Sequence, residues 1–415
     1  MTEGEQKLAL DGPPEQQGAV ARAMTDRQRI LAAIRGETPD RMPFVPRLDF
    51  WYRARRYTNT LPPELRSLSL MEIADRLGVG CYATVPDFSD FVGDEMADHG
   101  LGIIRLSVLP YKVSLQGVER RVLRSGCETV VEYHTPVGSV RTAMRFTEEM
   151  LAAGCSIPNF TEHAIRGPQD FAPVGYIFSH LKVEPHVEGY GAARERIGER
   201  GIVVANTSGR ACPMHHIMMD LMTPEQFFYA MEDYPSAVEQ LAEKMEPYYE
   251  GLKFVAAESP AEVVMLGGNY DDSLTYPAFF RKYILPSLRQ YAEVLHRKGK
   301  YLMTHTDGEN RLLLPLYLEA GFDVADSVCP YPMTRCRLEQ IREVFADRIT
   351  IWGGIPSILL CPDSASRDEF RKFVDEVVER YGHESHFVLG VSDMVPADAE
   401  WERLEYIAEK VTGLS

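Results

Sequence analysis

The chain has 415 residues, of which 45% are hydrophobic and 25% are charged, the proportions of a globular protein with a sizeable core. Its 61 acidic residues outnumber its 44 basic residues and give a net charge of −17, which argues against a nucleic-acid-binding surface. No apolar run approaches the roughly 20 residues that span a bilayer, so we expect a cytoplasmic protein outside the membrane. Seven scattered cysteines without a CxxC pair predict neither a disulfide framework nor a zinc ribbon.

The first 24 residues are rich in Gly, Gln, Glu and Ala and lack an apolar stripe, which predicts a flexible N-terminal extension. From Thr25, the segment TDRQRILAAIRG has an N-cap residue, apolar side chains at helical spacing and a closing glycine, which are typical of a short helix. The segment PDRMPFVPRL (39–48) then predicts a turn and a first strand. We expect residues 25–415 to form one domain.

An amphipathic helix, SLMEIADRL, and a second strand, GCYATVP, follow over residues 69–86. Residues 102–146 then interrupt the alternation with β-rich stretches separated by Gly-containing turns. These stretches are LGIIRLSVL, YKVSLQGVERRVL, ETVVEYHT and GSVRTAMRF. We predict an antiparallel β-hairpin insertion after the second strand.

Strands and helices alternate again after residue 200. Further strands are predicted near residues 202, 263, 301, 323, 350 and 387. Helices are predicted at 224–232, 236–257, 276–298, 310–320, 338–345, 365–381 and 399–411. This alternation indicates right-handed βαβ units and an α/β fold, a closed (β/α)8 TIM barrel of eight strands. An open doubly wound sheet is the alternative, but no Gly-rich dinucleotide fingerprint follows the first strand.

Polar residues at the C-terminal ends of the predicted strands are the candidates for a functional site, because TIM barrels carry their chemistry there. The set is rich in carboxylates and comprises Arg47, Asp49, Asp87, Asp90, Asn206, Arg210, Asn269, Asp271, Asp272, His305, Asp307, Glu309, Cys329, Tyr331 and Asp393. Arg47 and Arg210 could clamp an anionic substrate, or they could pair with carboxylates of the barrel mouth. Asp90 could do acid/base work or stabilise a turn.

The segment KYLMTHTDG (300–308) reads as a short apolar strand with His305 and Asp307 at its C-terminal end. Side chains alternate along a strand, so these two groups share one side. An imidazole and a carboxylate suit zinc or another divalent metal, and either Asp393 or Cys329 could add a third ligand. The alternative is that Asp307 caps the next helix while His305 makes a local hydrogen bond.

Several motifs occur in the order that such a barrel requires: ETVVEYHTPVGSV, EVVMLGGNYDDSLTYP, KYLMTHTDGEN, ITIWGGIPSILL and FVLGVSDMVPADAEWERL. With them the chain resembles the uroporphyrinogen decarboxylase superfamily over residues 25–412. The resemblance implies one of two chemistries, which are cofactor-free decarboxylation of porphyrinogen acetate groups and zinc-dependent methyl transfer to or from a corrinoid protein.

The resemblance is closer to the methyltransferase-like branch. There a His-x-Cys-Gly motif supplies two zinc ligands, and a cysteine near the last strand supplies another. In this chain the motif is His305-Thr306-Asp307-Gly308, and the last position falls on or next to Asp393. The decarboxylase motif Met-Arg-Gln-Ala-Gly-Arg is reduced to Arg47 in VPRLDFWYRARR, although Phe88-Ser89-Asp90 reproduces that family's Phe-Ser-Asp.

The leading hypothesis is a metal-dependent methyltransferase that moves a methyl group between a small methylated substrate, such as a methoxylated aromatic, and cobalamin on a partner corrinoid protein. His305, Asp307 and either Asp393 or Cys329 would hold the metal. The candidate catalytic residues are Asp90, Arg47 and Glu309, and the candidate substrate-binding residues are Arg210, Asn269, Asp271 and Tyr331. The alternatives are a cofactor-independent decarboxylase or lyase and a non-catalytic corrinoid- or tetrapyrrole-binding barrel. A homodimer is compatible with the resemblance.

Overall fold

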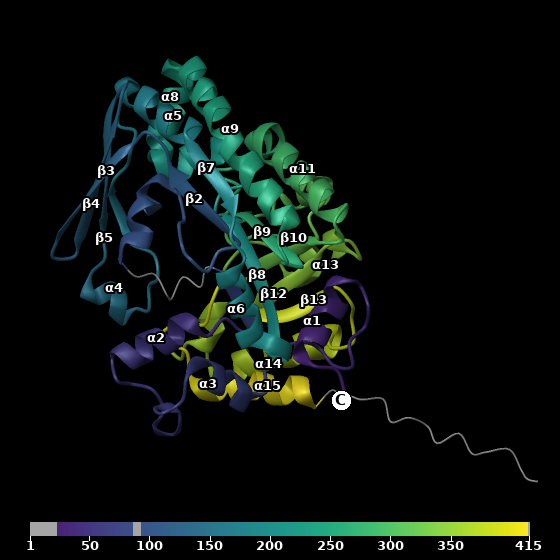
Figure 1. Cartoon of the computed structure of the whole chain (residues 1–415). Helices are drawn as coiled ribbons and strands as arrows, with labels where there is room; N and C mark the ends of the chain where they lie inside the picture. Colours follow the sequence, from purple (N-terminus) through teal and green to yellow (C-terminus); the bar gives the residue numbers. More distant parts are fainter. Residues whose placement is uncertain (1–22, 86–92, 414–415) are drawn as a thin grey trace, which may run out of the picture.

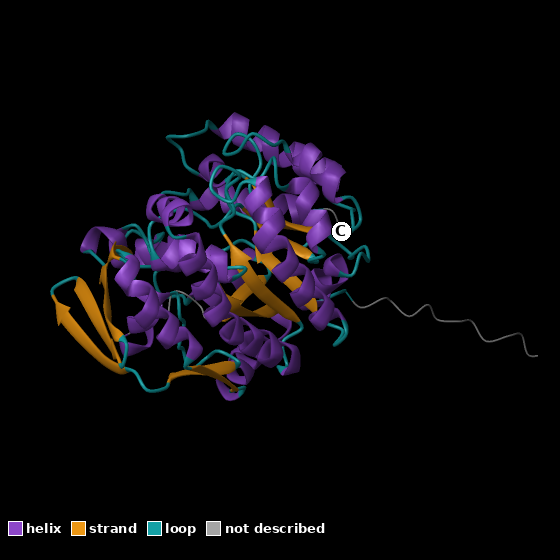
Figure 2. Cartoon of the chain, turned by 90° about the horizontal axis from the view of Figure 1, so that it is seen from above, coloured by secondary structure: helices purple, strands orange, loops and turns teal. Residues whose placement is uncertain are grey.

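The computed structural model describes residues 23–85 and 93–413, and a curled parallel sheet lies at its centre (Figures 1 and 2). Seven strands form this sheet, each parallel to its neighbours. In spatial order they are β1 (Cys81–Val85), β8 (Gly201–Ser208), β9 (Val263–Gly268), β10 (Tyr301–His305), β11 (Val324–Val328), β12 (Thr350–Ile355) and β13 (Phe387–Val391). The predicted α/β class and these seven predicted strands are confirmed.

The predicted first strand is reduced to a single parallel bridge between Phe44 and Leu389. The amide of Val45 donates to the Leu389 carbonyl at 2.8 Å, and the amide of Gly80 donates to the Phe44 carbonyl at 2.9 Å. Pro43 and Pro46 flank this short segment and have no N–H to extend either ladder. Residues 43–45 therefore connect the two edges of the sheet, an arrangement consistent with a TIM-barrel-like fold.

Helices surround the sheet, as the view from above shows (Figure 2). They are α1 (Asp26–Ile34), α2 (Asp49–Tyr57), α3 (Leu70–Leu77), α4 (Glu148–Ala152), α5 (Phe171–Ser179), α6 (Glu188–Ile197), α7 (Pro213–His216), α8 (Pro224–Asp233), α9 (Pro235–Glu258), α10 (Pro277–Phe279), α11 (Leu285–His296), α12 (Leu314–Ala320), α13 (Leu338–Phe345), α14 (Arg367–Tyr381) and α15 (Trp401–Thr412). Helix α2 was not predicted. The helices predicted after residue 200 are present with ends shifted by a few residues.

Two layers of apolar side chains hold the fold together. Alternate strand residues such as Val204, Met303 and Val388 form an interior cluster enclosed by the sheet. Ile30 and Ile34 of α1 belong to this cluster and cover one end of it. The larger cluster fills the space between the sheet and the helices. Because α1 covers the N-terminal ends of the strands, polar chemistry is left to their C-terminal ends.

Antiparallel strands lie within residues 111–185, a longer region than the hairpin predicted for 102–146. Strand β2 (Tyr111–Leu115) pairs with β7 (Leu181–Pro185), and a separate four-stranded sheet projects beside the central sheet (Figure 2). Its strands are β3 (Glu119–Ser125), β4 (Glu128–Thr135), β5 (Gly138–Arg145) and β6 (Asn159–Glu162). LGIIRLSVL is no strand. Its residues Ile103, Ile104 and Leu109 are apolar because they are buried in the core between helices and sheet.

Among the described residues, no helix is both long enough and apolar enough to cross a membrane.

Candidate functional site

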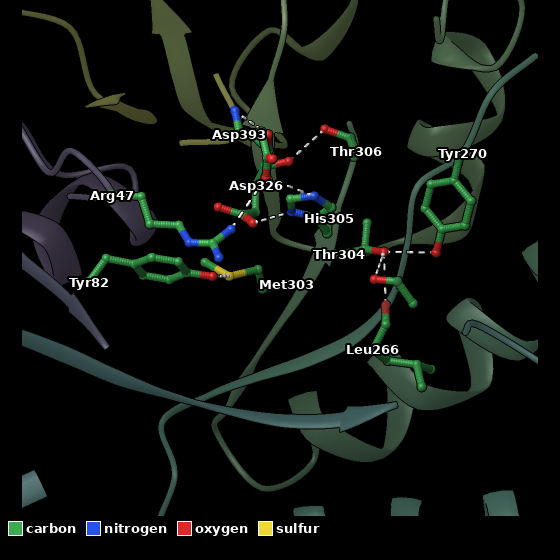
Figure 3. Close-up of polar contacts among 12 residues, drawn as sticks. Arg47, Tyr82, Leu266, Tyr270, Met303, Thr304, His305, Thr306, Asp326 and Asp393 are labelled. Atoms are coloured by element: carbon green, nitrogen blue, oxygen red, sulfur yellow. Dashed lines mark hydrogen bonds and ion pairs between the residues drawn. The ribbon is translucent and has the colours of Figure 1, made fainter. Parts of the chain in front are cut away.

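His305 is the last residue of β10, and its imidazole is oriented by Asp326 on the neighbouring strand β11 (Figure 3). The two residues are register partners, and Nδ1 of His305 lies 2.7 Å from Oδ2 of Asp326. An ionised carboxylate only accepts hydrogen bonds, so Nδ1 carries the proton of this contact. The amide and hydroxyl of Thr306 both donate to the Asp326 carbonyl and hold its backbone. Nε2 of His305 is thereby directed at a second carboxylate.

That second carboxylate is Asp393, just beyond the end of β13. Its Oδ1 lies 3.4 Å from Nε2 of His305. The Asp393 backbone has a φ of +55°, and its amide donates to Oγ of Ser327 at 2.6 Å. Ser327 occupies an irregularity of β11 at which the pairing with β12 shifts register. This irregularity therefore positions the backbone of Asp393.

Gly353 of β12 makes the irregularity of β11 possible. Its φ is +139°, and a Cβ atom at this position would lie 2.7 Å from both the amide nitrogen and the carbonyl oxygen of Val328. Only glycine permits this approach of the two backbones.

Arg47 forms a row of charged residues with Asp393 and His305 at the C-terminal ends of the strands, which we call the Arg47–His305–Asp393 row. It follows the bridge segment 43–45, and its Nη1 lies 3.3 Å from Oδ1 of Asp393. Its Nε lies 3.3 Å from Oδ1 of Asp49, the first residue of α2. Burial alone would lower the pKa of Arg47, but Asp49 and Asp393 raise it above its ordinary value. Arg47 therefore remains a cation at any pH at which the protein is folded.

The carboxylates around His305 control its protonation. Burial acts to lower the pKa of His305, but the hydrogen bond to Asp326 and the charges of Asp326, Asp393 and Asp307 raise it to about 9. Burial also raises the pKa of the Asp307 carboxyl, which the positive charge of His305 partly offsets. In the absence of a metal, His305 is an imidazolium at neutral pH.

Two of the residues present, His305 and Asp393, are spaced as two ligands of one metal ion would be. Two ligands at tetrahedral positions about 2.0–2.2 Å from one zinc ion are roughly 3.4 Å apart, and Nε2 of His305 is 3.4 Å from Oδ1 of Asp393. A histidine that ligates through one ring nitrogen while the other donates to a carboxylate is common in zinc sites. Within residues 23–85 and 93–413, no group of three or more His, Cys, Asp or Glu side chains is arranged to hold a metal. The described residues thus supply a pair of candidate ligands rather than a closed cage.

Cys329 and Asp307 were the other candidate ligands. Burial is the main cause that raises the pKa of Cys329 to about 12, followed by the charge of Asp307. Cys329 is only 6% exposed, and it is a neutral thiol at neutral pH. Asp307 lies beyond the end of β10 and acts on His305 through its charge.

The remaining candidates lie outside the Arg47–His305–Asp393 row. The guanidinium of Arg210 pairs with Asp220, with Nη2 2.8 Å from Oδ1. Asn269 has an exposed side chain, although its backbone amide donates to the His305 carbonyl at 3.1 Å.

The other candidates make local contacts. Asp271 accepts a hydrogen bond from the Ser273 amide, and Glu309 accepts one from the Arg335 amide. Tyr331 is 55% exposed, beneath the guanidinium of Arg337. Asp90, like Asp87, falls outside the described residues.

Two residues of the site were missed in the sequence. Asp326 lies within the strand FDVADSV, and Tyr82 lies on β1 with its hydroxyl 3.7 Å from Sδ of Met303 (Figure 3). A signal for Asp326 was present, because Asp is rare inside a buried apolar strand. Its pairing with His305 depends on the register between β10 and β11, which a single sequence does not reveal.

Comparison with known proteins places these observations in a family. A family model described as uroporphyrinogen decarboxylase (URO-D) matches residues 141–414. No curated protein matches the chain. Among solved structures, a methyltransferase from Methanosarcina mazei is similar in fold, with a TM-score of 0.50 and 15% sequence identity. The similarity covers 94% of this chain and 99% of that one.

Proposed function

Because the chain belongs to the uroporphyrinogen decarboxylase (URO-D) family, we propose that it is a methyltransferase of this family that uses a divalent metal. Its substrate would be a small methylated molecule, such as a methoxylated aromatic, and the methyl acceptor would be the corrinoid of a partner protein. The fold shared with a methyltransferase from Methanosarcina mazei is compatible with this proposal.

The observation that carries the proposal is the chain of contacts from Asp326 through His305 to Asp393. Asp326 fixes the ring and occupies Nδ1, so Nε2 is the ring nitrogen left for a ligand bond. His305 Nε2 and Asp393 Oδ1 are separated as two ligands of one zinc ion are. Asp307 lies close enough to influence both residues electrostatically and is the third candidate ligand, while Cys329 is the alternative to Asp393.

The charge balance of the mouth supports a bound cation. Four carboxylates, those of Asp49, Asp307, Asp326 and Asp393, face two cationic groups, Arg47 and protonated His305. This excess of negative charge has no protein partner in the described part of the site. A divalent cation that displaced the proton from Nε2 would lower this excess from two negative charges to one.

When bound, the metal would supply Lewis-acid polarisation of the heteroatom that carries the methyl group. The residues of the chain have separate tasks. Asp326 keeps Nε2 aimed at the mouth, and Arg47 holds Asp393 in place. Tyr82 packs against the buried Met303 and gives the site one apolar side. A ligand set of imidazole and carboxylate oxygens suits an alcohol or phenol oxygen better than a thiol, which favours an O-methyl substrate.

One observation favours a second function, that of a cofactor-independent decarboxylase or lyase. With a pKa of about 9, His305 holds a proton at neutral pH and can donate it from Nε2. A decarboxylase needs such a donor to protonate the carbanion that remains after carbon dioxide leaves. In that reaction no metal would be retained, so metal content separates the two functions.

The experiment is zinc titration by calorimetry of the chelator-treated protein, with His305→Ala and Asp393→Asn beside the wild type. We expect one zinc per chain in the wild type and loss of this binding in His305→Ala. The control is His296→Ala, which removes an exposed histidine that pairs with Asp323 elsewhere. A wild type that binds no zinc, or a His305→Ala variant that binds it as tightly, contradicts the proposal. A zinc-free protein that releases carbon dioxide from a carboxylated substrate would establish the second function instead.

A further inference from the structure

A cavity of about 510 Å³ opens beside the Arg47–His305–Asp393 row, between α2, α3, β1 and α6. Its position follows from the weak first strand. A backbone hydrogen bond from Gly80 to Phe44 joins segment 43–45 to the start of β1, and the two segments then separate. Arg47 and Tyr82 line the cavity and also belong to the candidate site, so the two are continuous. This volume is in the usual range for a small-molecule site.

Two arginines besides Arg47 line this cavity, and neither has an anionic partner in the described part of the chain. Arg53 lies one helical turn after Asp49 on the same face of α2, where an ion pair between them is expected. Asp49 instead pairs with Arg47. Nη1 of Arg53 is screened from solvent and has no hydrogen-bond partner. Arg196 of α6 lies at the exposed edge of the cavity.

The rest of the lining is largely apolar. Its apolar side chains include Leu48, Leu70, Met71, Ala74, Val108 and Ile197. A buried guanidinium nitrogen without a partner is costly, and an anionic ligand would satisfy it. The walls would accept an apolar body attached to that anion. The described lining includes one carboxylate, that of Asp49, which pairs with Arg47. Arg53 and Arg196 beside apolar walls therefore match an amphipathic acid.

We propose that this cavity binds the carboxylate of a small aromatic acid, with Arg53 as its main partner and Arg196 at the entrance. Because the cavity adjoins the site through Arg47, we infer that this acid is also the methyl donor. That second step rests on the proposed function. The binding of the acid itself does not depend on that function. The planar fork of Arg53 matches the two oxygens of a carboxylate.

The test is calorimetric titration of the full-length protein with 3-methoxybenzoate and with 3-methoxybenzamide, a neutral molecule of the same shape. We expect binding of the benzoate only. Loss of a charged hydrogen bond in Arg53→Gln should weaken benzoate binding by about 10- to 100-fold, and Arg196→Gln should weaken it less. Matched controls are Arg56→Gln on α2 and Arg194→Gln on α6, since neither residue lines the cavity. Both controls should bind within about twofold of the wild type.

Arg53→Lys keeps a positive charge and should recover part of the affinity, which shows that a loss in Arg53→Gln is not caused by unfolding. His305→Ala should bind the benzoate normally, so failure of metal-dependent methyl transfer would leave this result intact. Equal binding of benzoate and benzamide, or no binding of either, overturns the proposal. Tighter binding of 3-methoxyphenyl phosphate than of the benzoate would assign the cavity to phosphate esters and would also overturn it.

Discussion

Nδ1 of His305 and Oδ2 of Asp326 lie 2.7 Å apart on register partners of adjacent parallel strands. The contact fixes both the orientation of the ring and the nitrogen that carries the proton. It joins a residue at the end of one strand to a residue in the middle of the next. A change at Asp326 should therefore affect the chemistry of His305 without removing any candidate metal ligand.

Asp326→Asn should weaken zinc binding by about 10- to 100-fold, because the amide no longer enforces the tautomer that leaves Nε2 free. The measurement is the zinc dissociation constant by competition with a chromogenic chelator. Asp323→Asn is a matched control, since Asp323 pairs with His296 at 2.9 Å in a second His–Asp contact away from the mouth. Equal zinc affinity in Asp326→Asn and the wild type would show that the contact does not orient a ligand.

The ion pair of Arg210 and Asp220 should support the fold at neutral pH. Burial acts to raise the pKa of Asp220, but Arg210 and His216 lower it to about 2. Because the folded pKa is below the unfolded value, the stabilisation is present above about pH 4 and is lost as the pH falls towards 2. The shift corresponds to about 2 kcal/mol of unfolding free energy.

Asp220→Asn should therefore reduce the free energy of unfolding at pH 7 by about 3–5 kcal/mol, because Arg210 stays buried without its partner. Urea denaturation at pH 7 and at pH 3 provides the comparison, and the gap between variant and wild type should narrow at pH 3. Asp75→Asn, which breaks an exposed pair with Arg200, should cost less than about 1 kcal/mol. A gap that stays constant between the two pH values would refute the assignment.

Gly353→Ala should destabilise the protein by about 3 kcal/mol or more, because a Cβ at a φ of +139° would clash with the Val328 backbone. Gly299→Ala is the control for backbone conformation alone, since Gly299 has a φ of +67° with open space around it. That control should cost about 1–2 kcal/mol. Thermal unfolding measures the stability of both variants. Equal losses of stability would mean that β11 and β12 leave room for a Cβ atom at residue 353.

Sequence patterns located the candidate residues that lie close together in the chain. They did not reveal the contacts that depend on pairing between strands. His305 and Asp307 follow an apolar strand, and both the strand and its C-terminal end were found at the predicted place. Asp326 was missed because its role comes from strand register. Arg210 was placed correctly after β8, but its partner Asp220 lies ten residues later in a π-helical turn, Ile217–Leu221. Such turns have no reliable sequence signal.

The fold shows the same limit at its first strand. The segment PDRMPFVPRL was predicted as a turn followed by an apolar strand, and an extended segment lies at that place. The absence of N–H groups at Pro43 and Pro46 then decided how few ladder bonds the segment forms. The insertion was predicted from β-propensity, which identifies strands but not their partners. The pairing of β2 with the distant β7 was therefore not foreseen.

The choice between Asp393 and Cys329 as a further metal ligand can be decided by a pair of near-isosteric changes. Oδ1 of Asp393 lies 3.4 Å from Nε2 of His305, whereas Cys329 is a buried neutral thiol. Asp393→Asn should therefore lower zinc affinity by about tenfold or more, and Cys329→Ser should leave it within about twofold. The hydrogen bond from the backbone amide of residue 393 to Ser327 is retained in the variant, so the position of the side chain is preserved.

Cobalt substitution adds a direct readout, because a thiolate ligand gives a charge-transfer absorption that oxygen and nitrogen ligands lack. That absorption in the wild type, lost in Cys329→Ser, would assign the ligand to Cys329.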